Sequence, residues 1–135
     1  MVELLDYATN VPTPVTNGAS IPVPITPAGQ GISQIRLTVP RSNNRVEIKA
    51  TVGLQGTSGI SRVLFRVFRD TTEISYGLQG IEASFEGFYL VSFQAIDTNA
   101  PTGVHDYTIS VENLSAGTNA RVVGPIQVSG TVYGL

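Results

Sequence analysis

After Gly31, the chain is a succession of short segments in which apolar and polar residues alternate. In residues 45–52, every second residue from Val46 to Val52 is apolar, and the residues between them are charged or carry a hydroxyl. A period of two is that of a β-strand with one buried face. Segments of this kind, bounded by turn-forming residues, predict strands at 32–39, 45–52, 62–69, 72–78, 81–86, 88–96, 104–111 and 121–133.

About eight strands without helical periodicity predict an all-β fold with antiparallel strands. Turn signals recur about every 8–12 residues, which is typical of a β-sandwich or jelly roll. Residues 53–59 are predicted to be a loop, because Gly53, Gly56 and Gly59 lie within them. Residues 88–96 are apolar at both alternating sets of positions, which predicts a central strand. The sequence thus predicts a jelly-roll β-sandwich over residues 32–135.

Residues 1–31 differ from the rest of the chain. Five of the eight prolines lie between Pro12 and Pro27, and no charged residue follows Asp6 in this stretch. Proline fixes its own φ and biases the preceding residue toward extended geometry, so an extended Pro-rich N-terminal arm is predicted. An apolar arm packs on its own domain, as an edge strand does, or docks on a neighbouring subunit. The docking hypothesis names these side chains: Leu4, Leu5, Tyr7, Val11, Val15, Ile21, Val23 and Ile25.

Composition narrows the classes of function. A chain of 135 residues is long enough for one domain with a real core. The net charge of −2 argues against a nucleic-acid partner, and the absence of cysteine excludes disulfides, thiol catalysis and thiolate metal sites. No apolar run approaches the ~18 residues of a membrane span. The first ten residues lack the basic start of a secretory signal, so we expect neither a membrane partner nor a signal peptide.

Catalytic constellations are weak in this sequence. His105 is the single histidine, and its neighbour Asp106 points to the opposite side of a strand, so the two cannot form a dyad. Glu82 and Glu86 share one face of a short predicted strand and are interpreted as a solvated face, not as a pair for glycoside hydrolysis. We therefore expect no enzymatic activity, no catalytic residues and no cofactor.

Two short motifs bear on metals and glycans. The stretch Asp97-Thr98-Asn99 offers oxygen ligands but lacks the signature of a dedicated calcium loop, and such side chains commonly cap their own turns. We therefore expect no metal site. The triplet at residues 113–115 matches an N-glycosylation sequon, a pattern that is frequent by chance.

The basic residues are clustered. Seven of the eight lie between Arg36 and Arg69, and Arg62, Arg66 and Arg69 form a candidate basic stripe for anionic sugars or an acidic partner. The alternative is ordinary outward-facing charge, paired with carboxylates such as those of Glu47, Asp70 and Glu73.

Several motifs resemble known families. Residues 87–93, Gly-Phe-Tyr-Leu-Val-Ser-Phe, are similar to the Gly-aromatic-Tyr-x-x-Ser-aromatic strand of the globular heads of complement and tumour-necrosis-factor-like proteins, and residues 129–135 resemble their C-terminal strand. Residues 63–70 and 97–113 resemble spore-surface proteins of endospore-forming Firmicutes, among them exosporium proteins and endospore appendage fibre subunits. The resemblance covers residues 32–135.

The resemblance implies a trimeric jelly-roll head whose strands near the three-fold axis are apolar on both sides. Tyr89, Phe93 and Tyr107 would then lie at the trimer interface or in the core, two options that the sequence does not separate. Collagen-like exosporium glycoproteins carry such heads on a Gly-X-Y stalk, which this chain lacks. The absence of cysteine argues against the disulfide-stabilised appendage type, so the resemblance points to a cysteine-free appendage fibre subunit.

The leading hypothesis is therefore a structural subunit that self-assembles, as trimers stacked through their N-terminal arms, into a fibre on the bacterial endospore surface, outside the cell. Its partners would be further copies of itself, an anchoring spore-surface protein and a tip protein. The alternative is a trimeric receptor- or glycan-binding head at a fibre tip or viral spike. A virion or phage capsid protein is a third reading, because jelly rolls recur there.

Overall fold

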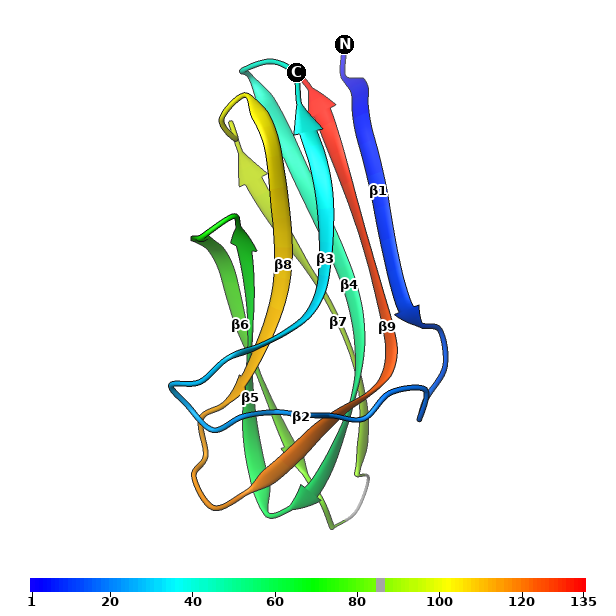
Figure 1. Cartoon of the computed structure of the whole chain (residues 1–135), viewed down its shortest axis with the longest axis vertical. Coiled ribbons are helices and arrows are strands. Elements are labelled where there is room, and N and C mark those ends of the chain that lie inside the picture. The colour runs from blue at the N-terminus through cyan, green and yellow to red at the C-terminus, as the bar shows by residue number, and fades with distance from the viewer. Residues whose placement is uncertain (85–86) are drawn as a thin grey trace.

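The computed structural model describes residues 1–84 and 87–135, and in these residues the chain forms strands and no helix (Figure 1). No helix in the described part is long and apolar enough to cross a membrane. The all-β prediction is confirmed. The strands are β1 (Glu3–Thr13), β2 (Ile21–Pro22), β3 (Gln30–Val39), β4 (Asn44–Ser58), β5 (Ile60–Arg69), β6 (Thr72–Glu82), β7 (Phe88–Thr98), β8 (Gly103–Asn113) and β9 (Asn119–Gly134).

The strands form two antiparallel sheets packed face to face, which confirms the jelly-roll β-sandwich. One sheet has the order β1-β9-β4-β7 with the short β2 added to β9, and the other has the order β3-β8-β5-β6. Both termini lie at one end of the elongated sandwich (Figure 1). Neighbouring strands of the first sheet are distant in sequence, β4 and β7 included, and the core closes only when β9, the last strand, pairs with β1 and β4.

The core lies between the sheets and follows the predicted alternation. On β4 the side chains of Val46, Ile48 and Val52 are buried, and Lys49 between them is exposed. Across the sandwich, Phe65 and Val67 of β5 are buried in the same cluster. Each fully buried side chain of this size contributes roughly 1.5–3 kcal/mol, so the inward rows are the main source of stability.

The loop predicted at residues 53–59 is wrong, because β4 continues as a strand to Ser58. Glycine at position 53 serves a close approach between strands and not a turn. A Cβ on Gly53 would lie 1.8 Å from the carbonyl oxygen of Gly124 on β9, a distance that no real Cβ tolerates. The irregular register between β4 and β9 falls at the same place, between Val52 and Leu54.

Two other strand predictions need correction. The segments 72–78 and 81–86 were predicted as separate strands, but β6 runs unbroken to Glu82, because Gly80 stays in the ladder opposite Arg62. Glu86 lies outside the described residues, so the predicted face shared by Glu82 and Glu86 is not described. The strand at 88–96 was predicted to be central, but β7 is at the edge of its sheet. Its outward apolar residues, which prompted that prediction, are exposed in the single chain.

The N-terminal segment is part of the sandwich in the single chain, so the structure does not show a separate arm. β1 pairs with β9 over most of its length, and β2 pairs with β9 at Ile21 and Pro22. The Asp6 carboxylate also accepts a hydrogen bond of 2.7 Å from the Thr38 amide on β3, which ties the two sheets together at this side. The expected contact of residues 1–31 with a second copy stays a prediction.

Candidate functional site

The outer face of the β1-β9-β4-β7 sheet carries a broad shallow groove of about 570 Å³. Its floor is polar, because the register aligns Ser129, Lys49 and Gln94 across β9, β4 and β7. In the next row, Thr51 and Ser92 lie opposite each other and their hydroxyls are 3.1 Å apart, within hydrogen-bond distance. We call this surface the outer face of the five-stranded sheet.

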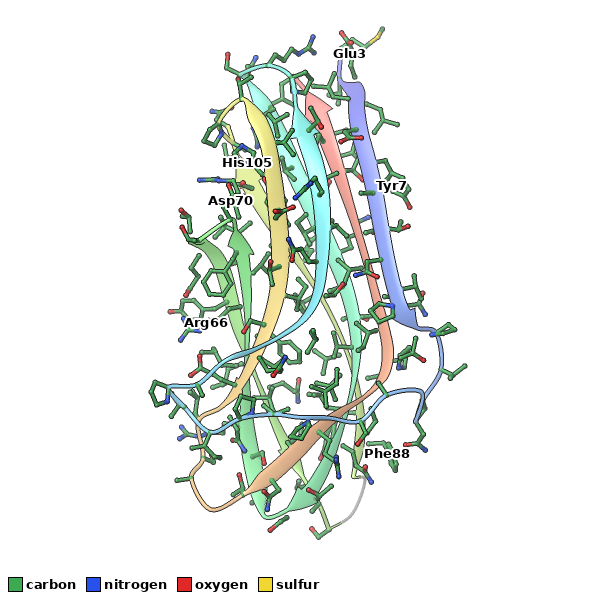
Figure 2. The ribbon with its side chains drawn as sticks, in the orientation of Figure 1. Glu3, Tyr7, Arg66, Asp70, Phe88 and His105 are labelled. Atoms are coloured by element: carbon green, nitrogen blue, oxygen red, sulfur yellow. The ribbon has the colours of Figure 1, made fainter. Side chains whose placement is uncertain are left out.

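Both ends of this outer face are apolar. At one end, Leu4 lies opposite Tyr133, and Ile96 of β7 lies opposite Glu47. At the other end, the β7 side chains of Phe88 and Leu90 are 47% and 67% exposed. Figure 2 shows Phe88 at the end of the sandwich away from Glu3, with Tyr7 on the outer side of β1. Exposed apolar side chains grouped at two ends of one sheet face are typical of a protein interaction surface.

The side chains predicted to dock on another copy divide into two groups. Val23 is buried in the chain's own core, and Leu5 and Ile21 pack against that core. These three residues contribute to the fold of the single chain. The others remain exposed and available for contacts: Leu4, Tyr7, Val11, Val15 and Ile25.

The three aromatic residues predicted at the interface or core also divide. Tyr107 is 1% exposed and belongs to the core. Tyr89 and Phe93 are half-buried on the inner side of β7, where the ring of Phe93 packs 5.1 Å from that of Phe65 at a tilt of 46°. The Tyr89 hydroxyl accepts a hydrogen bond of 3.2 Å from the Glu82 amide, so this ring bridges the edge strands β7 and β6. A contact of either ring with a second copy stays a prediction.

A buried ion pair joins the two sheets. The Arg69 guanidinium donates to both carboxylate oxygens of Asp97 at 2.7 Å, and the Tyr107 hydroxyl donates to the same carboxylate at 2.7 Å. The hydrogen bond to Asp97 raises the pKa of Arg69, against the opposing effect of burial. Burial first, and then the bond to Asp97, raises the pKa of Tyr107 far above its usual value. Both donors therefore keep their protons over the whole working pH range.

The side-chain oxygens of Asp97 and Asn99, which were considered as calcium ligands, accept hydrogen bonds from other residues of the chain. Asp97 holds Arg69 and Tyr107, and the Asn99 side chain accepts a hydrogen bond of 3.2 Å from the Asn44 amide. Within residues 1–84 and 87–135, no group of three or more carboxylate and histidine side chains is arranged to hold a metal ion.

The predicted basic stripe is not a single surface. Arg66 lies on the outer side of β5 and pairs with Glu112 at 2.8 Å and with Glu73. These two bonds raise its pKa. Arg62 donates to the Ser115 hydroxyl at 3.0 Å, and Arg69 points between the sheets. Because all three guanidinium groups have acceptors inside the chain, the alternative of ordinary paired charge describes them better, with Glu112 and Asp97 as partners that alternation did not reveal.

His105 is bound on both ring nitrogens. Its Nδ1 lies 2.7 Å from the Asp70 carboxylate, and its Nε2 lies 2.6 Å from the Pro101 carbonyl oxygen (Figure 2 labels His105 and Asp70). Asp106, as expected, is not its partner and pairs with Arg36 at 2.9 Å. With two acceptors around it, the ring is held as a structural donor and has no free nitrogen to act as a base.

The sequon at Asn113 is closed to glycosylation in the folded chain. Asn113 is 0% exposed, and its amide nitrogen donates to the hydroxyls of Ser61 at 3.2 Å and Thr118 at 2.9 Å. Its side-chain oxygen accepts the Ser115 amide at 3.0 Å. The residue therefore serves as a polar anchor under the β8–β9 loop.

One feature of the outer face was not singled out from the sequence. Arg45, Glu47 and Lys49 follow one another along the outer side of β4, and none of them is in an ion pair within the part of the chain that is described. Alternation placed all three on one face. Whether they have partners depends on which side chains of β7 and β9 lie next to them. Only the pairing of the strands in the structure shows this.

Comparison with known proteins identifies the fold. No family model matches the sequence, and no curated protein matches it. A chain in the structure of infectious bursal disease virus, Gt strain, aligns over 95% of this chain with a TM-score of 0.59 and 7% identity. A chain of infectious bursal virus-derived T=1 particles aligns over 95% with a TM-score of 0.58 and 8% identity.

This chain spans 36% and 38% of those viral chains, about a third of their length. At such low identity the likeness shows the β-sandwich fold alone. The resemblance to spore-surface proteins stays a prediction.

Proposed function

We propose that this chain is a structural subunit that assembles with copies of itself. The observation that carries the proposal is the outer face of the five-stranded sheet. It presents exposed apolar side chains at both ends, and none of residues 1–84 and 87–135 forms a further layer on it. Half-buried antiparallel sheets normally show polar residues on the solvent side. Leu4 and Leu90, 66% and 67% exposed, break that rule at opposite ends of the face.

The fold supports an assembly role by analogy. One of the similar chains comes from infectious bursal virus-derived T=1 particles. The charges support it too, because most arginines pair with carboxylates of the described residues, which disfavours binding of a polyanionic ligand. The apolar ends of the outer face are then the candidate contact surfaces.

In the finer form of the proposal, the copies form trimers that stack into a fibre on the endospore surface. The resemblance of residues 63–70 and 97–113 to spore-surface proteins motivates this form. A closed ring uses two different patches of each copy, and a stack needs a third contact. The β1 side chains of Tyr7 and Val11, exposed beside the sheet edge, are the candidates for that third contact.

The test is sedimentation of the full chain over a concentration series, with negative-stain electron microscopy of the same samples. We expect a trimer at low concentration and thin fibres with a regular axial repeat at high concentration. A chain that stays monomeric at every concentration would overturn the proposal. Discrete trimers without fibres would retain self-assembly and overturn the stacking.

A further inference from the structure

Three charged side chains form a line on the outer side of β4. Arg45, Glu47 and Lys49 are two residues apart, so they point to the same side of the strand, in the order positive, negative, positive. Lys49 stands over the polar groove. Arg45 and Glu47 stand at the apolar end of the face.

The line is unpaired within the part of the chain that is described. Four other arginines, by contrast, pair with carboxylates: Arg36, Arg41, Arg66 and Arg69. Arg45 is half-buried, and its Nε–H is covered by neighbouring atoms with no acceptor among the described residues. A polar group that is withdrawn from water without a hydrogen bond is costly, so such a group calls for a partner.

The surroundings of Arg45 and Glu47 are apolar. A hollow of about 320 Å³ at this end of the face is lined by both residues and by Val2, Ile96, Tyr133 and Leu135. Arginine and tyrosine set among aliphatic side chains are the composition of an interface centre, where the charged groups lose most of their water. An opposite charge supplied there would be screened little by solvent.

We infer that a second copy of this chain covers this end of the outer face, with Arg45 of one copy paired to Glu47 of the next. The inference rests on the proposed self-assembly and names the contact that sets its register. Charge complementarity favours a second copy as the partner at this end of the face, because every copy carries both the positive and the negative member of the pair on one face of β4. Around a two-fold or three-fold axis each Arg45 then meets a Glu47, and no charge is left over at the contact.

Charge reversal tests the pairing. Arg45→Glu and Glu47→Arg should each weaken self-association at least about tenfold, measured by sedimentation of the full chain, because each places like charges together. The double variant, with both changes in one chain, should recover wild-type association. Lys49→Gln is the matched control on the same strand face, and it should associate as the wild type does.

Mixing the two single variants shows whether the pair lies between chains. One variant carries arginine at both positions and the other carries glutamate at both, so only a contact between chains can pair them. The mixture should associate more tightly than either variant alone. Recovery should be complete in a two-fold contact and partial in a ring of three, where one contact joins like chains.

The outcomes separate this inference from the proposed function. If the wild-type chain stays monomeric, both fail. If it associates and Arg45→Glu associates equally well, self-assembly stands and the Arg45–Glu47 contact is overturned. Failure of both the double variant and the mixture to recover, or a loss in Lys49→Gln as large as that in Arg45→Glu, would also overturn the pairing.

Discussion

At the scale of single residues, His105 joins its own strand to the preceding loop and to a turn that is distant in sequence. It stands on β8, binds the Asp70 carboxylate in the β5–β6 turn, and binds the Pro101 carbonyl in the β7–β8 loop. Burial is the largest influence on its pKa and lowers it, but the two hydrogen bonds and the charge of Asp70 together outweigh burial, so the pKa lies above 6.5. The backbone amide of Asp106 and then His105 hold the pKa of Asp70 below 3.8.

The signs of these shifts predict a pH dependence of stability. A raised histidine pKa gives stability that is fully present below 6.5 and is lost as the pH rises through the raised pKa. A lowered aspartate pKa gives stability that is present above 3.8 and is lost as the pH falls through the lowered pKa. Because the Asp70 side chain is 49% exposed, solvent screening limits the loss on the alkaline side to about 1 kcal/mol.

Urea unfolding at about pH 5.5 and about pH 8.5 checks this dependence. The wild-type free energy of unfolding should be lower at the higher pH, and His105→Gln, which cannot titrate, should show a flatter profile. Since His105 is the single histidine, its imidazole signals can be followed by NMR in the same buffers. A wild-type profile as flat as that of the variant would contradict the role given to the bonds of His105 with Asp70 and Pro101.

At the scale of strands, the close approach of β4 to β9 requires glycine at position 53. Gly53→Ala would drive a Cβ into the Gly124 carbonyl, and backbone cannot move aside as a flexible side chain can. We expect a loss of at least about 1–3 kcal/mol in the free energy of unfolding. Gly77→Ala on β6 is the control, since a Cβ there meets nothing within 4 Å and the change should stay within about 1 kcal/mol. Equal urea midpoints for the two variants would contradict this account.

The same strand shows how far the sequence predicts the structure. Alternation in residues 45–52 was enough to place Val46 and Ile48 inward, because burial of one face sets the register. It could not locate the end of β4, since glycine is the signal both for a turn and for a close approach of strands. Alternation also led to the prediction that β7 is a central strand. A strand face that the chain itself covers and a face that a partner covers are both apolar, so the sequence does not distinguish them.

At the scale of the whole molecule, the structure changes how the N-terminal segment can be tested. Deleting residues 1–20 would remove β1 from β9 and so expose the edge of β9 and destabilise the sandwich. Val23→Asp would place a charge in the chain's own core and cost several kcal/mol. Because both changes damage the fold of the single chain, a loss of fibres in either variant would not identify a contact between copies. Tyr7 and Val11 offer a cleaner route, because they are exposed on a strand that stays paired and line the groove of the outer face, not the hollow lined by Arg45 and Glu47.

We therefore expect that the double variant Tyr7→Ser and Val11→Ser keeps trimers but loses fibres. Thermal unfolding at a concentration where both proteins are trimeric should change little, because these two exposed side chains add little to the core of a single copy. The matched control is Tyr76→Ser with Leu78→Ser on β6, equally exposed apolar residues of the other sheet, which should leave fibres intact. Fibres of normal length from the double variant would show that stacking uses another surface, whereas loss of trimers in it would place β1 in the ring contact itself. The two results distinguish the stacking contact from the contact that Arg45 and Glu47 define, because only the latter responds to charge reversal.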